Sequence, residues 1–125
     1  MSDLKAGAIG WVDLTVPNAA EVRDFYAAVV GWTVQDVKMG EYSDFTMRSA
    51  AGEAVAGVCH ARGSNTGLPA QWLVYVSVPD LDASLKACVA KGGNVYRPRA
   101  SMGSYGDVAV IQDPAGAVMA VIQPK

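Results

Sequence analysis

Two segments of the chain, residues 11–18 and 73–80, alternate between aliphatic and mixed side chains. A period of two residues is typical of a β-strand, whose successive side chains point to opposite faces of a sheet. In both segments the aliphatic residues share one face, and we expect that face to meet a helix. The opposite face, which carries Trp11 and Asp13 in the first segment and Tyr75 in the second, is then expected to line whatever the sheet encloses.

The two segments belong to an internal duplication. The offset that takes Trp11 to Leu73 also takes Gly31 to Gly93. Gly52 and Gly116, which are expected in tight turns, have a slightly larger offset, so the two copies differ by two residues in a loop. The chain is therefore predicted to contain two versions of one supersecondary unit.

Each copy continues with a helix and three short strands. Apolar residues at helical spacing follow Asn18 and Asp80, two suitable N-cap residues, and glycines are expected to end both helices. The short strands are expected at residues 33–37, 44–48, 54–60, 95–97, 108–112 and 118–123. The sequence therefore predicts an α+β fold made of two tandem βαβββ modules.

A single domain over residues 1–125 accounts for the whole pattern. The first module is expected at about 8–61 and the second at about 70–123, with a linker rich in glycine and polar residues at about 62–69. Within the first helix, the apolar stripe that includes Phe25 and Tyr26 is expected to face the core.

The composition favours a globular protein, with 51% hydrophobic and 18% charged residues. A formal net charge of −2 offers no basic face for nucleic acid. No apolar run approaches the roughly 20 residues of a membrane span, and the N-terminus lacks the apolar core of a signal peptide. We therefore expect a cytoplasmic protein, in which Cys59 and Cys88 are free thiols.

Three motifs occur in a characteristic order: Ile9–Pro17, then Phe25-Tyr26 with Val30-Gly31-Trp32, and finally Asp113-Pro114-Ala115-Gly116. Together with the duplication they resemble the vicinal oxygen chelate superfamily of glyoxalases, bleomycin-resistance proteins and dioxygenases. The resemblance covers roughly residues 8–123. It implies that the modules form a curved, cup-like mixed sheet with helices on the outside, that the cup holds a small molecule, and that the protein is a homodimer.

Metal-dependent members of this superfamily hold a divalent ion in the cup with His or Glu from the first and last strands of the modules. The matching positions in this chain are Trp11, Ala56, Leu73 and Ala120. None of these side chains carries an imidazole, carboxylate or thiolate donor. We therefore expect no metal at the usual site and no cofactor.

Other residues can supply chemistry in such a cup. His60, the only histidine, shares a strand face with Ala56 by alternation and is expected near the rim, and Asp13 shares a face with Trp11. A His–Asp pair can act in acid–base catalysis or hold a metal weakly. Equally, His60 can end its strand in solvent while Asp13 bonds to a neighbouring group. Trp11 and Tyr75 can contact a ligand or fill the core.

The segment from Arg97 to Gly106 is expected to be a loop at the mouth of the cup. Arg97 could then meet a carboxylate or phosphate, with Tyr105 beside it. The alternative is a solvated surface loop. Trp72 is expected at the cup edge or in a dimer contact, and Trp32 in packing.

These residues leave three classes of function open. The first is a metal-free apolar cup that binds a small aromatic or amphipathic molecule, lined by Trp11, Asp13, Ala56, Leu73, Tyr75, Ala120, Arg97 and Tyr105. The second is a metal-independent lyase or isomerase that uses Asp13, His60 or Tyr75. The third is a regulatory or partner protein. A metal-dependent enzyme is the least favoured class because the ligands are absent.

Overall fold

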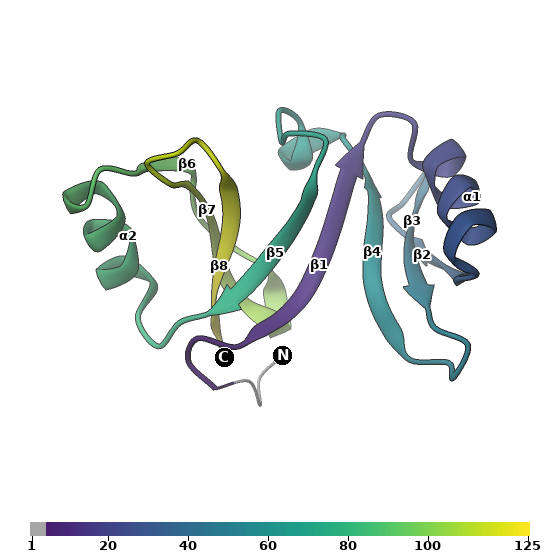
Figure 1. The fold of residues 1–125 in the computed structure, drawn as a ribbon, viewed down its shortest axis with the longest axis horizontal. Helices are drawn as coiled ribbons and strands as arrows, with labels where there is room; N and C mark the ends of the chain where they lie inside the picture. Colours follow the sequence, from purple (N-terminus) through teal and green to yellow (C-terminus); the bar gives the residue numbers. More distant parts are fainter. Residues whose placement is uncertain (1–4) are drawn as a thin grey trace. The chain divides into compact units, whose positions relative to one another are not determined.

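The computed structural model describes residues 5–125, apart from the side chain of Ser64. The first four residues, where the sequence predicts no signal peptide, lie outside the described residues. The described residues form two α-helices, eight strands and two short 3-10 helices (Figure 1). In chain order these are β1 (Ile9–Val16), α1 (Ala19–Val30), β2 (Thr33–Lys38), β3 (Ser43–Arg48), β4 (Ala54–His60), η1 (Gly63–Asn65), β5 (Trp72–Ser77), α2 (Leu81–Ala90), β6 (Asn94–Ser101), η2 (Gly103–Tyr105), β7 (Gly106–Gln112) and β8 (Val118–Pro124). The predicted α+β fold with two βαβββ modules is confirmed.

The chain divides into two compact units. The N-terminal unit is Val12–Trp72, and the C-terminal unit is Leu73–Lys125 together with the described residues before Val12. In the C-terminal unit, the segment that leads into β1 is bonded to the end of β5: the Gly7 amide donates to the Ser77 carbonyl at 2.7 Å, and the Ser77 amide donates to the Ala8 carbonyl at 2.9 Å.

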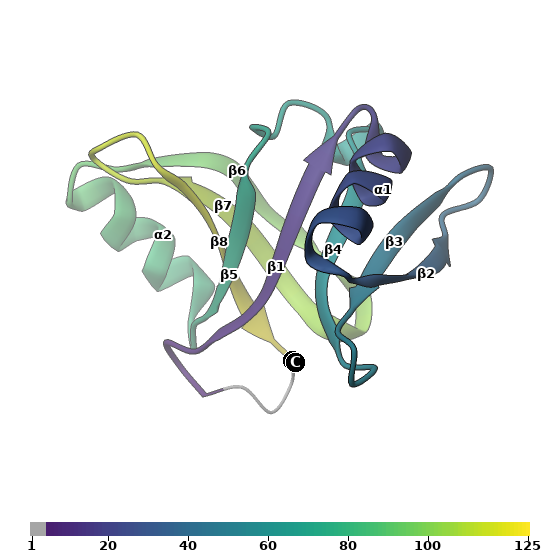
Figure 2. The ribbon, with the colours of Figure 1, turned by 45° about the vertical axis from the view of Figure 1, so that its right-hand side comes forward.

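The sheet of the N-terminal unit has the strand order β2-β3-β4-β1. Strands β1 and β4 are parallel, whereas β2–β3 and β3–β4 are antiparallel, so the sheet is mixed. Helix α1 contacts β4 and β2 and lies against one face of this sheet (Figure 2). The parallel pairing requires a long crossover, to which α1 contributes.

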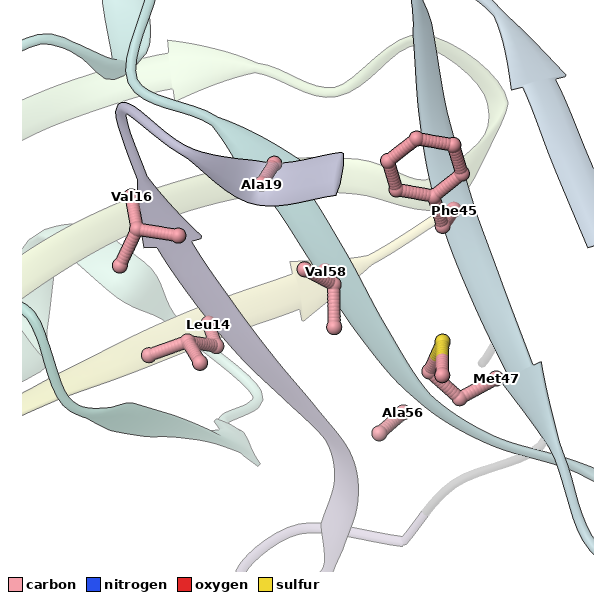
Figure 3. Close-up of a cluster of buried hydrophobic side chains, with 7 residues drawn as sticks. All are labelled: Leu14, Val16, Ala19, Phe45, Met47, Ala56 and Val58. Atoms are coloured by element: carbon pink, nitrogen blue, oxygen red, sulfur yellow. The ribbon is translucent and has the colours of Figure 1, made fainter. Parts of the chain in front are cut away.

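The core of the N-terminal unit is a cluster of side chains on one face of its sheet, together with Ala19 at the start of α1 (Figure 3). Alternate residues of three strands point into it, which is the period expected when one sheet face is covered. The buried members are Leu14, Val16, Ala19, Phe45, Met47, Ala56 and Val58. Val22 and Tyr26 from α1, with Trp32 and Trp72, pack at its border, which confirms the packing role expected of Trp32.

One expectation about α1 is wrong. The apolar stripe predicts that Phe25 faces the core with Tyr26, but the Phe25 side chain is 57% exposed, while Tyr26 is half-buried. The stripe of apolar residues on this helix is wider than the face that the sheet covers. Val22 and Tyr26, four residues apart, share the covered face, and Phe25 is turned by about 100° from Tyr26.

The C-terminal unit repeats the arrangement with the strand order β5-β8-β7-β6. Strands β5 and β8 are parallel, and the other two pairs are antiparallel. Helix α2 contacts β6, β7 and β8, and Leu81, Ala109 and Val121 form the buried cluster beneath it. Neither α1 nor α2, the two α-helices of the described residues, has the length and apolar character that a bilayer span requires.

Candidate functional site

Four residues lie side by side on the face of the C-terminal sheet that points away from α2. Tyr75 pairs with Ala120, Ala120 with Val110, and Val110 with Arg97. Paired residues of neighbouring strands project to the same side of a sheet. The residues that alternate with Ala120 and Val110 lie in the cluster beneath α2. Three of the predicted site residues, Tyr75, Ala120 and Arg97, are thus brought together in one row.

We call this surface the Tyr75 face. Its buried residues are Leu73, Tyr75, Ser77, Val110, Val118, Ala120 and Ile122. Tyr75 is only 9% exposed, so its side chain is largely withdrawn from solvent. These buried residues are therefore apolar apart from one phenol and one hydroxyl, and the half-buried Arg97 lies at the edge strand.

The predicted loop that begins at Arg97 is largely a strand. Residues 97–101 continue β6, and Arg97 and Ala100 pair with β7. Register shifts on both sides of Arg97 accommodate the proline that follows it, which has no amide proton for the ladder. Tyr105 belongs to η2 and is exposed, and Trp11 is half-buried in β1.

Ala56 does not share a face with Asp13, contrary to the expectation. Asp13 pairs with Gly57, whereas Ala56 pairs with Met47 in the core beneath α1. The cause is a β-bulge: Met47 pairs with Ala56, but Arg48 pairs with Ala54, which leaves one extra residue in β4. A slip of one residue moves every side chain to the other face.

The bulge also corrects the alignment of the two copies. Asp13 pairs with Gly57 as Tyr75 pairs with Ala120, so the structural counterpart of Ala120 is Gly57. Neither Gly57 nor Ala120, and neither Trp11 nor Leu73, offers a donor atom that binds a divalent ion. The described residues contain no group of three or more His, Cys, Asp or Glu side chains close enough to hold a metal. The residues at these positions therefore do not fit the metal of the metal-dependent members.

The carboxylate that meets His60 is Asp44, at the start of β3. One oxygen, Oδ1 of Asp44, accepts from the backbone amide of His60 at 2.8 Å and lies 3.2 Å from its Nδ1. Asp44 is 6% exposed, and the His60 side chain is 19% exposed. An ionised carboxylate only accepts hydrogen bonds, so this contact is a hydrogen bond when Nδ1 of His60 carries a proton.

Sequence reasoning missed Asp44 because its contact depends on strand register. Phe45 pairs with Val58 in the antiparallel ladder, so Asp44 lies level with the end of β4. The available signal was a lone acidic residue at the first position of a short predicted strand. The residue that Asp44 contacts cannot be identified until the antiparallel pairing of β3 and β4 is known.

His60 and Asp13 do not form the pair that the sequence suggests. His60 is paired with Val16, on the sheet face that carries Phe45, and its ring lies 5.9 Å from the Phe45 ring. Asp13 shares the other face with Cys59. Burial, followed by the charges of Asp13 and Asp44, raises the pKa of the Cys59 thiol.

Two aromatic rings contact the imidazole of His60, and an arginine lies over each of these rings. The ring of Tyr42 meets the imidazole edge to face, with 5.3 Å between centroids. The guanidinium of Arg62 lies 4.0 Å above the Tyr42 ring, and that of Arg23 lies 4.5 Å above the Phe45 ring. We call Tyr42, Asp44, His60 and Arg62 the His60 cluster.

Comparison with curated proteins shows two groups of relatives. The protein named "Putative glyoxylase CFP32" of Mycobacterium tuberculosis is 32% identical over 124 residues, which are 98% of this chain and 48% of that protein. Anthracycline biosynthesis protein DnrV of Streptomyces peucetius is 35% identical over 136 residues, with 97% of this chain and 48% of that protein covered. The chain thus spans about half the length of the curated relatives it matches.

Solved structures with the same fold are more distant in sequence. Methylmalonyl-CoA epimerase from Mycobacterium tuberculosis superposes with a TM-score of 0.59 at 14% identity, over 98% of this chain and 93% of that one. Hypothetical protein BH1468 from Bacillus halodurans reaches a TM-score of 0.60 at 9% identity, over 97% and 96% of the two chains. At this identity the similarity concerns the fold.

The family itself is shown by sequence. The model of the Glyoxalase/Bleomycin resistance protein/Dioxygenase superfamily matches residues 8–121, nearly the whole chain. This match agrees with the duplicated βαβββ architecture and with the two relatives that share about a third of its residues. The chain belongs to the glyoxalase/bleomycin resistance protein/dioxygenase superfamily.

Proposed function

We propose that this protein binds a small aromatic or amphipathic molecule, with the Tyr75 face as its binding surface. The observation that carries the proposal is the row of Tyr75, Ala120, Val110 and Arg97, which sets one phenol and one guanidinium at the two ends of an apolar strip. Small-molecule sites combine mostly apolar walls with a few polar groups that orient the ligand. The phenol would accept or donate a hydrogen bond, and the guanidinium would suit an anionic substituent.

The names of the relatives support a small aromatic ligand. DnrV and DauV are named as anthracycline biosynthesis proteins, at 35% and 34% identity, and anthracyclines contain fused aromatic rings. A planar ring system would stack on an aromatic side chain with about 1 kcal/mol beyond the burial of area.

The binding test uses an anthraquinone carboxylate, which is planar, aromatic and anionic, and follows the quenching of tryptophan fluorescence. We expect saturable quenching by the wild-type protein. Tyr75→Phe should weaken binding about tenfold, because one buried hydrogen bond is lost. Arg97→Met should weaken binding of the carboxylate but not of the uncharged anthraquinone.

The matched control is Tyr96→Phe, which removes the same atom from an exposed tyrosine of β6. Its affinity should equal that of the wild type. Absence of saturable quenching, or equal affinity of the Tyr75→Phe and wild-type proteins, would rule out the Tyr75 face as the binding surface.

A metal-independent lyase or isomerase is the second candidate, and one observation favours it. Of the three candidate catalytic residues, Asp13, His60 and Tyr75, His60 is held by a buried carboxylate, that of Asp44. A general base needs a fixed orientation and tautomer as well as a free lone pair. Small-molecule binding and proton transfer are compatible in one protein.

We also propose that the protein is a homodimer, as the superfamily resemblance implies. Closed twofold association is the commonest form of self-assembly. Light scattering on the eluting peak of a gel-filtration column gives the mass directly. We expect twice the chain mass of 13.0 kDa, and a mass of one chain at micromolar concentration would contradict the proposal.

A further inference from the structure

We infer that His60 and Asp44 form an acid–base pair that exchanges a proton with a small anionic molecule. Nε2 of His60 is the reacting atom, Asp44 is a positioning residue, and Arg62 attracts the anion. The inference rests on the second candidate function and adds two residues and a class of substrate to it.

Asp44 fixes the imidazole in two ways. Its Oδ1 accepts from the amide of His60 at 2.8 Å, which anchors the backbone, and faces Nδ1 at 3.2 Å, which sets the ring. With Nδ1 protonated, the lone pair of the neutral ring is on Nε2.

Nε2 of His60 is at least partly exposed to solvent. The contacts of the ring are with Asp44, Tyr42 and Phe45, and none of them involves a hydrogen bond to Nε2. Within residues 5–125, every buried side-chain nitrogen and oxygen has a hydrogen-bond partner. Nε2 makes no such bond to the described protein atoms, so it is not buried, in agreement with the 19% exposure of the His60 side chain.

Arg62 supplies a positive charge near this ring. Its guanidinium lies over the ring of Tyr42, which in turn meets the imidazole of His60 edge to face. Arg23 and Arg99 are paired with Asp24 and Asp107, whereas no carboxylate of the described residues pairs with Arg62. A cation without a paired carboxylate beside a base favours a substrate that carries a carboxylate.

The proton step balances without a co-reactant. Nε2 takes a proton from a carbon next to a carbonyl group, and the bonding electron pair stays on the substrate as an enolate. The imidazolium then returns the proton to the same carbon or to a neighbouring atom. The substrate is isomerised with its composition unchanged, which is the class of reaction that a single acid–base pair can complete.

The first test determines the tautomer of the His60 imidazole by nitrogen NMR. The assignment is unambiguous because the chain has a single histidine. The wild-type protein should show the Nδ1–H tautomer. Asp44→Asn retains an acceptor oxygen and should keep this tautomer, whereas Asp44→Ala should lose it. Glu53→Gln, which removes an exposed carboxylate from the same unit, is the control and should change nothing. An Nε2–H tautomer in the wild type, or an unchanged tautomer in a folded Asp44→Ala protein, would overturn the role of Asp44.

The second test measures proton exchange with pyruvate, which has acidic methyl protons and a carboxylate. In deuterium oxide, the wild-type protein should replace these protons with deuterium faster than buffer does, and His60→Gln should fall to the buffer rate. Arg62→Met should raise the half-saturating pyruvate concentration about tenfold with little change in the maximal rate. Lys38→Met, which removes an exposed charge of the same unit, is the control and should exchange like the wild type.

Exchange at the buffer rate in the wild type, or unchanged exchange in His60→Gln, would overturn the inference. The residues substituted in the anthraquinone test belong to the C-terminal unit, and those substituted in the pyruvate test belong to the N-terminal unit. Failure of the acid–base pair with intact aromatic binding therefore rejects this inference alone. Failure of aromatic binding with intact exchange rejects the Tyr75 face alone.

Discussion

Cys59 shows how neighbours from other strands determine the chemistry of one side chain. It lies in β4, pairs with Thr15 of β1, and is close to the carboxylates of Asp13 and Asp44. Burial is the largest cause of its raised pKa, and both negative charges act in the same direction. Each factor disfavours the thiolate.

We expect the thiol of Cys59 to react slowly in the folded protein, because the thiolate is the nucleophile and its pKa is raised. Cys88→Ala leaves Cys59 as the only thiol. This variant should react with Ellman's reagent at pH 8 far more slowly when native than in denaturant. Equal rates would show that the thiol is open to the reagent and ionised.

The same shift makes stability depend on pH. A raised native pKa means that the folded state binds more protons than the unfolded state above the ordinary pKa of cysteine. The contribution of Cys59 to the free energy of unfolding is therefore fully present below the ordinary pKa of cysteine and is lost as the pH rises above it. Urea titrations at pH 8 and pH 10 give the decline in the free energy of unfolding over this range. The decline should be about 1–2 kcal/mol smaller for Cys59→Ala than for the wild type. Cys88→Ala should keep the wild-type decline.

At the scale of elements, strand β3 holds the N-terminal core together. Met47 is 0% exposed and lies with Phe45 and Ala56 in the cluster of Figure 3. Met39, in the turn after β2, is 45% exposed. The two methionines have the same side chain in opposite environments.

Met47→Ala should lower the free energy of unfolding by about 2–5 kcal/mol, since it removes buried atoms and leaves a cavity. Met39→Ala should change it by less than about 0.5 kcal/mol. Urea unfolding followed by circular dichroism measures both values. Similar losses for the two variants would contradict the burial of Met47.

The two helix starts provide another matched pair. The side chain of Asp80 accepts from the Ala83 amide at 3.1 Å, as expected of an N-cap. Asn18 occupies the same position before α1 but makes no cap bond, and its amide donates to Glu21 at 2.6 Å instead. Equivalent positions in the two copies thus have different local energetics.

Asp80→Ala should therefore cost about 1 kcal/mol of stability, which is typical of a lost N-cap. Asn18→Ala should cost less, because only an exposed side-chain bond is removed. Thermal unfolding of the two variants gives the comparison, and a larger loss for Asn18→Ala would contradict it.

At the scale of the whole molecule, strand β1 begins in one unit and ends in the other. Residues before Val12 belong to the C-terminal unit, where Gly7 and Ala8 are bonded to Ser77. The C-terminal unit is therefore built from two separate stretches of the chain. A fragment that starts at Leu73 lacks one of them.

We expect the fragment 73–125 to be unfolded when it is expressed alone, because it lacks the bonds of Gly7 and Ala8 and falls near the size at which a single core becomes insufficient. The full chain should unfold in one transition, with the same midpoint by circular dichroism and by fluorescence. A folded fragment, recognised by dispersed NMR signals, would show that the first stretch is dispensable.

The sequence alone determined the architecture and the family. The duplication, the alternating strands, the Asp80 cap and the left-handed turn at Gly31 after α1 all leave local signals. Apart from the duplication, such signals lie within a few residues of one another. They predicted both α-helices and all eight strands, and the boundaries of β4 in full.

Tertiary structure decided which side chains meet. A bulge opposite Met47 placed Ala56 in the core, and the register of β3 against β4 gave His60 the carboxylate of Asp44 rather than that of Asp13. A strand has the same alternating pattern in any register, so the sequence cannot show which residue lies opposite which. The site depends on that choice, because a contact of about 3 Å between strands is made or lost by a slip of one residue.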